Sequence, residues 1–293
     1  MSDGGIRKIA GVGGLDTLVC TTRAGDSFEL VPERGAIVTR LTLEGQEVLY
    51  LEPATLADRS KNVRGGIPVL FPIAGKLPGG RYDWEGETFA LPQHGFARSH
   101  AWKVTGKDVA EGDPFVQLSL LPDDSTRQSY PFEFEATIAF LLSGGQLTVT
   151  FDVTNTGNEP MPVHAGFHPY FFVPDVDKRW ARMETNATRA FDNLTGASGP
   201  LAPIDLTAAE VDLHLEDHGR ETTLLHRGAG RRPVALGWSP NVTRVVLWTL
   251  RGRDFVCVEP WTAPGGALAT RDAALALLEP NASLQLRLRI GLG

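Results

Sequence analysis

Two histidines and one carboxylate in this chain have the types and neighbours that acid–base chemistry needs. His94 lies between Pro-Gln and Gly-Phe, His168 begins the aromatic run His168-Pro-Tyr-Phe171, and Glu259 directly precedes Pro-Trp. At neutral pH a carboxylate can accept a proton and a histidine can give one. The three side chains therefore suit a reaction that moves protons between the oxygens of one substrate.

Glu259 comes at the end of the apolar run Phe255-Val-Cys-Val258. A carboxylate in such a place is costly unless it has a partner or a function. Partial burial would raise its pKa and strengthen it as a base. The alternative interpretation is a structural ion pair at the strand end, with Arg98 or Arg64 as the partner.

The histidines also allow a metal interpretation. His164 and His168 lie four residues apart, and residues at that spacing can share a face and bind a metal together. No third ligand stands at a suitable spacing, so we expect no metal and no cofactor. His94 alone is compatible with a loop histidine that only binds backbone groups. The remaining histidines stand in polar contexts and are expected at the surface: His100, His214, His218 and His226.

Tryptophan and arginine accompany the acid–base residues. Trp261 could cover the C–H surface of a sugar, and the guanidinium groups of Arg64 and Arg98 could bind its hydroxyls or a phosphate. Gly65 and Gly66, which follow Arg64, are expected to let the backbone approach the ligand closely. The expected ligand is a small-molecule sugar or sugar phosphate.

The elements that must position these residues are strands, because the dominant hydrophobic period is two. A tight hairpin is predicted over 82–89, with Glu85-Gly86 at its tip. Helical signals are few: one turn opening at Thr207, and a helix over 270–278 that Glu279-Pro280 ends. Without strand–helix alternation, one large antiparallel β-sandwich is the expected fold. The predicted strands cover 28–31, 36–43, 116–120, 134–140, 146–153, 244–250, 254–258 and 284–290.

Composition excludes several classes of protein. The 293 residues carry a net charge of −7, which argues against a nucleic-acid surface. No stretch approaches the ~18 apolar residues that span a membrane, and the first residues contain no apolar secretory core. Cys20 and Cys257 cannot form a disulfide framework. We therefore expect a cytoplasmic monomer or weak dimer without nucleic-acid or membrane partners.

Four motifs, in order along the chain, resemble the aldose 1-epimerase (galactose mutarotase-like) family. They are Arg64-Gly-Gly-Ile-Pro-Val-Leu-Phe-Pro72, Leu91-Pro-Gln-His-Gly-Phe-Ala-Arg98, His168-Pro-Tyr-Phe171 and Phe255-Val-Cys-Val-Glu-Pro-Trp261. The resemblance runs from about residue 25 to the C-terminus. It implies the family's fold, a large antiparallel β-sandwich, and a single domain over 1–293. The role of residues 1–24 does not follow from the resemblance.

The resemblance also implies an activity, the interconversion of the α and β anomers of a sugar. Glu259 matches the family's base, which takes the proton of the C1 hydroxyl, and His168 matches its acid, which protonates the ring oxygen. His94 matches a second histidine that binds and polarises the sugar. Asp212 is the nearest match to an aspartate that contacts sugar hydroxyls.

The Gln-His-Gly-Phe-Ala-Arg pattern, with Arg64 upstream, is more similar to the hexose-6-phosphate mutarotase branch, in which arginines hold the phosphate. Arg64 and Arg98 could form such a clamp, and a neutral aldose remains the other substrate class. A non-catalytic sugar-binding or sugar-sensing protein on the same fold is the alternative function. A metal enzyme built on His164 and His168 is disfavoured, because no further histidine and glutamate are grouped with them.

Overall fold

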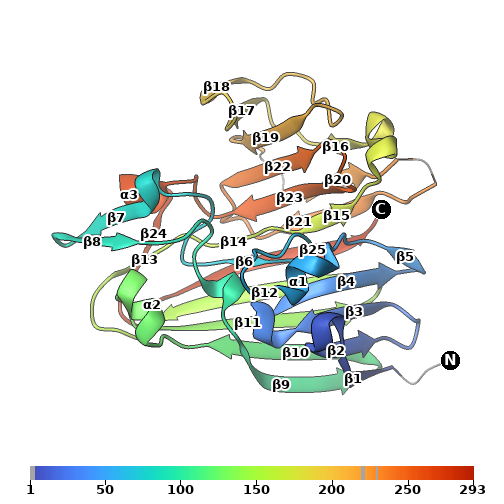
Figure 1. The fold of residues 1–293 in the computed structure, drawn as a ribbon, viewed down its shortest axis with the longest axis horizontal. Helices are drawn as coiled ribbons and strands as arrows, with labels where there is room; N and C mark the ends of the chain where they lie inside the picture. Colours follow the sequence, from blue (N-terminus) through green and yellow to red (C-terminus); the bar gives the residue numbers. More distant parts are fainter. Residues whose placement is uncertain (1–3, 219–221, 229) are drawn as a thin grey trace.

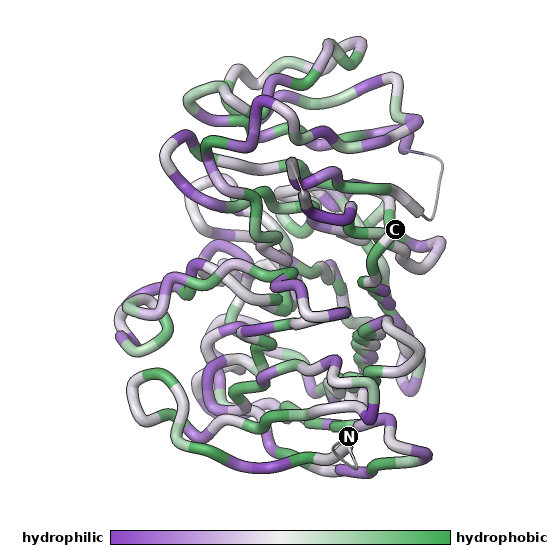
Figure 2. The backbone as a smooth tube through the Cα atoms, turned by 90° about the vertical axis from the view of Figure 1, so that its right-hand side faces the viewer, coloured by the Kyte–Doolittle hydropathy of each residue, from purple (hydrophilic) through white to green (hydrophobic). Residues whose placement is uncertain are grey.

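The computed structural model describes residues 4–218, 222–228 and 230–293, and the counts that follow refer to these residues. Three large antiparallel sheets make up most of the molecule (Figure 1). The backbone coloured by hydropathy shows apolar and polar stretches alternating along it (Figure 2). This alternation is expected where strands bury one face and expose the other.

The N-terminal sheet has five strands. Leu18, Cys20, Phe28 and Leu30 are buried in the main apolar core, so the segment before residue 25 is an integral part of this sheet. Its strands in spatial order are β1 (Gly5–Ala10), β2 (Asp16–Thr21), β3 (Ser27–Val31), β4 (Ile37–Leu43) and β5 (Gln46–Glu47).

The second sheet has eight strands and shows the period-two pattern most clearly. Every second residue of β12 and of most of β25 is buried, as their alternating sequences predict. Its strands in spatial order are β16 (Arg182–Glu184), β20 (Thr222–His226), β21 (Val234–Trp238), β25 (Ser283–Leu292), β12 (Gln146–Asn155), β11 (Phe134–Ser143), β10 (Asp113–Leu120) and β9 (Lys103–Ala110).

The third sheet carries most of the residues that the sequence points to. Its central strand β23 is buried along its whole length, and the turn at 251–253 joins it to β22. Its strands are β18 (Ala197–Pro200), β17 (Arg189–Asp192), β19 (Glu210–Leu215), β22 (Arg244–Leu250), β23 (Phe255–Trp261), β14 (Gly166–Phe167) and β6 (Val69–Leu70), with β15 (Tyr170–Phe172) also paired to β23.

Short elements complete the fold. The predicted hairpin is confirmed as β7 (Arg81–Trp84) and β8 (Glu87–Ala90), and β13 (Met161–Val163) pairs with β24 (Ala276–Leu278). The helices are α1 (Pro53–Ala57), α2 (Asp124–Ser129) and α3 (Ala267–Thr270), with 3-10 turns η1 (Val12–Gly14), η2 (Pro32–Arg34), η3 (Pro78–Gly80), η4 (Ala97–Ser99) and η5 (Asp175–Trp180).

Both helix predictions are wrong. Helix α3 ends at Thr270, where the predicted helix would begin, because Arg271 adopts a positive φ of 51° that stops it. The apolar residues that follow enter β24 and pair with β13 instead. The segment at Thr207 is a non-helical turn leading into β19. Tertiary strand pairing has overridden local helix propensity at both places.

One apolar core spans the molecule. The ring of Phe71 lies at its centre, with ring centroids 5.0 Å from Phe134, 5.7 Å from Phe151 and 5.8 Å from Phe96. The contacts with Phe134 and Phe151 join the loop after β6 to strands β11 and β12 of the second sheet. None of the described helices is long and apolar enough to cross a membrane.

Candidate functional site

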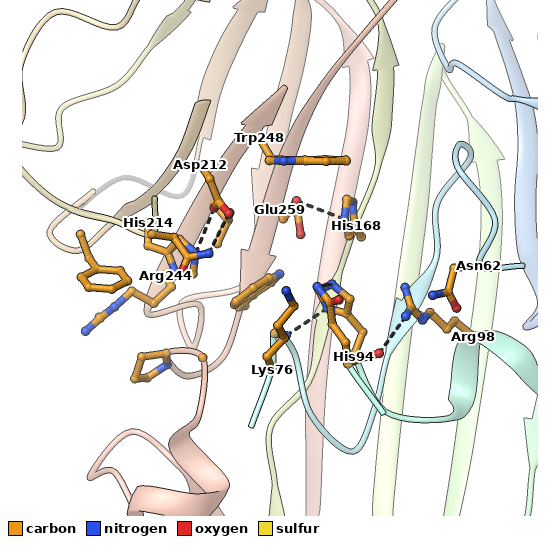
Figure 3. A pocket seen from close by; sticks show the side chains of 18 of the residues that line it. Asn62, Lys76, His94, Arg98, His168, Asp212, His214, Arg244, Trp248 and Glu259 are labelled. Carbon is orange, nitrogen blue, oxygen red and sulfur yellow. Dashed lines mark hydrogen bonds and ion pairs between the residues drawn. The ribbon is translucent and has the colours of Figure 1, made fainter. Parts of the chain in front are cut away.

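A cavity of about 740 Å3 lies beside the third sheet and contains most of the candidate residues. The strands β19, β22 and β23 contribute one wall, and the loops around 62–64, 75–76 and 93–98 contribute the other (Figure 3). The sequence-predicted residues that it brings together are His94, His168, Glu259, Trp261, Asp212, Arg64 and Arg98.

Glu259 and His168 form a buried pair. His168 Nε2 lies 3.4 Å from Glu259 Oε1, and the two residues are 6% and 2% exposed. The strand register explains the contact, since Tyr170 of β15 lies opposite Cys257 of β23. Counting two residues outward on each antiparallel strand brings His168 and Glu259 to facing positions on the same side.

The pair holds its protons in an unusual way. Burial raises the pKa of Glu259 well above its ordinary value, the charge of Asp212 adds to this, and Trp261 and Arg98 oppose it. Burial lowers the pKa of His168 to about 3, with Arg98 contributing in the same direction. Both shifts favour the uncharged state of the pair, in which Glu259 keeps its carboxyl proton and His168 is a neutral imidazole.

Aromatic rings fix the imidazole of His168. The ring of Tyr170 stacks on it with centroids 4.6 Å apart and planes 3° from parallel, and the ring of Trp248 meets it edge-on at 5.8 Å. Glu259 Oε2 and His168 Nδ1 have no hydrogen-bond partner among the described residues. The Trp261 indole is close enough to lower the pKa of this carboxyl but lies outside hydrogen-bonding geometry, so Oε2 can accept a hydrogen bond from a ligand in the cavity.

His94 is held by a reciprocal contact with Gly75. Its backbone N–H donates to Gly75 O at 2.8 Å, and the Gly75 N–H donates to His94 Nδ1 at 3.0 Å. Because Nδ1 accepts, Nε2 carries the ring proton of the neutral imidazole. The Gln93 side-chain nitrogen lies 3.1 Å from Nε2, so this tautomer requires the Gln93 amide to turn its oxygen toward the ring proton or to a ligand. Burial, followed by the neighbouring His168, keeps the pKa of His94 well below its usual value. His94 is thus a neutral imidazole that is bound to backbone through Nδ1 and also lines the cavity.

The turn that presents His94 is strained. His94 and Gly95 have φ values of 66° and 68°, so two successive residues are left-handed. A side chain on Gly95 would place its Cβ 2.2 Å from Phe71 O. Positive φ at a non-glycine residue is uncommon and often marks a functional position. Glycine at 95 is required by this close backbone approach.

The ring of Trp261 is packed between histidine rings and does not present an open aromatic face to a sugar. Its ring meets those of His94, His164 and His214 at steep angles, with centroids 5.8, 6.1 and 5.2 Å away. The indole is 3% exposed, and its N–H has no hydrogen-bond partner among the described residues. Trp261 therefore shapes the bottom of the cavity more than it covers a sugar face.

The donor atoms that could hold a metal in the structure are not those of His164 and His168, the pair considered from the sequence. His164 is fully buried, its Nδ1 accepts the N–H of Ala74 at 3.4 Å, and among the described residues it does not belong to the group of donor atoms that contains His168. Donor atoms of His168, Cys257 and Glu259 lie within 4.8 Å of one another. Burial raises the pKa of the Cys257 thiol well above its ordinary value, which disfavours the thiolate that metals bind.

Asp212 lies on the wall formed by β19, with His214 beside it. Asp212 Oδ1 is 3.3 Å from His214 Nε2, and its Oδ2 accepts from Asn193 Nδ2 at 2.7 Å. Burial alone would raise the pKa of Asp212, but these two hydrogen bonds hold it below its ordinary value. The surface placement expected for His214 is wrong, since it is 7% exposed and lines the cavity. His218 is also buried rather than at the surface.

The opposite wall is cationic. Arg64, Lys76 and Arg98 all line the cavity, and Figure 3 shows Arg98 across the Glu259–His168 pair from Asp212. Arg98 Nη2 donates to Gln93 O at 2.7 Å, and the Arg64 guanidinium lies 5.8 Å from the Trp248 ring centroid. Among the described residues neither arginine forms an ion pair with Glu259, so the structural ion-pair interpretation does not hold.

The role expected for the two glycines after Arg64 is wrong. An added Cβ would lie 2.5 Å from Leu51 Cα at Gly65 and 2.3 Å from Val38 O at Gly66. Their φ values are 135° and 65°. The glycines let this loop lie against neighbouring backbone, and neither lines the cavity.

Several lining residues were missed from the sequence. Trp248 and Arg244 follow the period of two on β22, and Glu210 and His214 follow it on β19, on either side of the predicted Asp212. This alternation could have identified them once one residue on each strand was assigned to the cavity. Lys76 lies in a loop and carries no such signal.

Comparisons with known proteins agree with the geometry. The sequence matches the aldose 1-epimerase family over residues 21–282. The solved structure of the Slr1438 protein from Synechocystis sp. PCC 6803 is 33% identical, covers 92% of each chain and superposes with a TM-score of 0.87. A Cenchrus ciliaris protein that carries the provisional name glucose-6-phosphate 1-epimerase is 26% identical over 277 residues, 84% of this chain and 78% of that protein.

The fold is shared more widely than the sequence. A galactose 1-epimerase structure from Lactobacillus acidophilus NCFM is 15% identical, covers 99% of this chain and 98% of that chain, and has a TM-score of 0.76. At this identity the likeness concerns the fold alone. The large antiparallel β-sandwich and the family resemblance that the motifs predicted are both confirmed.

Proposed function

Because the chain belongs to the aldose 1-epimerase family, whose members are isomerases that act on sugars, we propose that it interconverts the α and β anomers of a hexose by acid–base ring opening. The observation that carries this proposal is the buried Glu259–His168 pair, with 3.4 Å between Oε1 and Nε2, at the bottom of a polar cavity. A binding protein would have no need of a shared proton in such a costly place.

Transfer of the Glu259 carboxyl proton within the pair supplies both the base and the acid. Its movement from Glu259 to His168 produces a carboxylate and an imidazolium, and the net charge of the buried pair stays at zero. Glu259 then accepts the proton of the C1 hydroxyl, while His168 donates its proton to the ring oxygen as the C1–O5 bond breaks. The open aldehyde rotates about C1–C2 and closes on its other face, which returns both protons.

His94 has a separate role in this scheme. Its Nε2–H donates to the sugar near the ring oxygen or O1, where negative charge develops as the bond breaks. The Gly75 N–H at Nδ1 holds the tautomer that makes this donation possible. His94 and His168 are both neutral, but of the two described side chains only His168 is paired with Glu259, from which it can receive a proton; His94 therefore binds the sugar and leaves the acid role to His168.

The two walls give the sugar an orientation. Asp212, held as a carboxylate, accepts hydrogen bonds from sugar hydroxyls on the β19 side. Arg64, Lys76 and Arg98 face them and suit an anionic substituent, which supports a 6-phosphorylated hexose over a neutral aldose. A 6-phosphorylated hexose is therefore the proposed substrate class.

The test is anomer exchange measured with wild-type protein and with Glu259→Gln on glucose 6-phosphate and glucose. Accelerated exchange that is lost in the variant supports the proposal, and a lower KM for the phosphorylated sugar supports the substrate class. Sugar binding without any acceleration would overturn the proposal in favour of a non-catalytic sugar-binding protein.

A further inference from the structure

Arg34 is a buried cation whose hydrogen bonds all go to main-chain oxygens. It is 3% exposed and lies at the end of the 3-10 turn η2. Its acceptors belong to the C-terminal end of helix α1 and the turn that follows, where backbone carbonyls have no helical partner. Nε donates to Leu56 O at 3.1 Å, and Nη2 donates to Thr55 O, Asp58 O and Lys61 O at 3.1, 3.2 and 3.1 Å.

The segment that Arg34 holds leads directly into the cavity wall. Asn62, Val63 and Arg64 follow it, and all three line the cavity. The Arg64 backbone returns to the same segment, because its N–H donates to Thr55 Oγ1 at 2.9 Å. Loss of the Arg34 bonds would therefore free the loop that determines where Arg64 lies.

Gly35, the next residue, holds the second arginine of the wall. Its N–H donates to His100 O at 2.8 Å. Its φ is 78°, and an added Cβ would lie 2.2 Å from Arg98 O, so the backbone of Arg98 rests directly on this glycine. A small cavity bordered by Arg34, Asn62 and Arg98 marks where the two loops approach each other.

We propose that the turn Pro32–Gly35 is a positioning element that sets the spacing of Arg64 and Arg98, through the Arg34 side chain on one loop and the Gly35 backbone on the other. The inference rests on the proposed function, in which this wall binds the anionic group of a hexose phosphate. Bidentate recognition of phosphate depends on the relative placement of guanidinium groups. Arg34 would thereby determine specificity without contacting the sugar.

The test compares Arg34→Gln and Arg34→Lys with the matched control Arg227→Gln. Arg227 is also fully buried and also bonds backbone oxygens, those of Glu47 and Arg232, but it holds no segment that the cavity lining includes. For Arg34→Gln we expect KM for glucose 6-phosphate to rise about tenfold, since small misplacements of binding groups are costly. Its kcat and its KM for glucose should stay within about threefold of wild type.

Arg34→Lys, which keeps the charge but offers one donor head instead of a fork, should recover part of the affinity for the phosphorylated sugar. Arg227→Gln should lower the melting temperature without changing the preference between the two sugars. If Arg34→Gln lowered kcat and raised KM to the same extent on both sugars, and if its effects matched those of Arg227→Gln, the inference would be overturned. Arg34 would then be a stability residue.

Hydrogen exchange separates this inference from the proposed function. If wild-type protein does not prefer the phosphorylated sugar, the proposed substrate class fails, and amide exchange in Arg34→Gln then decides the positioning role. Faster exchange confined to 55–64 and 98–102 supports it. Unchanged exchange in these segments, or an increase spread over the whole chain, overturns it.

Discussion

Replacement of Glu259 by glutamine should abolish most turnover while the fold is retained. The amide has the shape of the carboxylate and cannot accept the C1 hydroxyl proton. Its NH2 group would also lie about as near to His168 Nε2 as the present Oε1, which is 3.4 Å away, and could donate to that nitrogen. The acid is then impaired together with the base. We expect turnover to fall at least about 100-fold, the lower end of the usual contribution of a positioned general base.

That factor corresponds to about 2.7 kcal/mol of transition-state stabilisation, at about 1.36 kcal/mol for each factor of ten. Optical rotation of freshly dissolved α-anomer, followed in stopped flow, measures the rate above the spontaneous reaction. Asp26→Asn is the control, because Asp26 is a buried carboxylate that accepts the Glu44 N–H at 2.7 Å and does not line the cavity. Near-wild-type turnover in Glu259→Gln would remove Glu259 from the mechanism.

The same substitution has a consequence for stability. Since the folded-state pKa of Glu259 is raised, the stability that its protonated form contributes is present below the unfolded value of about 4.3 and is lost as pH rises through the folded value. Glutamine has no such titration. At pH 8 the melting temperature of Glu259→Gln should therefore equal or exceed that of wild type, and a large decrease would contradict the buried, neutral carboxyl.

Further predictions concern the pH dependence of turnover, Arg98 and Gly95. Because burial and Arg98 lower the pKa of His168 to about 3, kcat/KM should change less than about twofold between pH 7 and pH 5; a tenfold fall at pH 5 would indicate an ordinary histidine. On the alkaline side kcat/KM should fall as the raised pKa of Glu259 is passed. Arg98→Ala should raise KM for glucose 6-phosphate by about tenfold or more and that for glucose far less, as expected for lost charge-assisted hydrogen bonds; equal losses on both sugars would count against phosphate recognition. In denaturant melts Gly95→Ala should lower the free energy of unfolding by about 2 kcal/mol more than Gly79→Ala. Both glycines have positive φ, but only Gly95 lies against backbone, at Phe71, so equal effects would refute the steric argument.

The fold could be predicted from the sequence where strand periodicity was undisturbed. The strands β12 and β25 bury alternate residues over almost their whole length, so their sequences carry the signal directly. The segment after Arg271 was mistaken for a helix because its alanines and leucines favour helix locally. Its pairing with β13, more than a hundred residues earlier in the chain, leaves no trace in local sequence.

The site was predictable as a set of residues but not as an arrangement. The neighbours of Glu259 and His168 indicated acid–base chemistry, yet their facing positions depend on the register between β15 and β23. His214 looked like a surface residue because its neighbours in sequence are acidic, and its burial arises from Trp261 and Phe191, which are distant in sequence. The glycines at 65 and 66 were assigned to a ligand because sequence does not reveal which backbone they approach.

The most direct test of the proposed activity is exchange NMR on the anomeric protons of glucose 6-phosphate, glucose and galactose with wild-type protein. We expect an α–β exchange rate that rises in proportion to protein concentration above the buffer rate, and that is fastest with glucose 6-phosphate. Exchange at the buffer rate for all three sugars, under conditions where their resonances still shift on binding, would contradict the catalytic role of the Glu259–His168 pair.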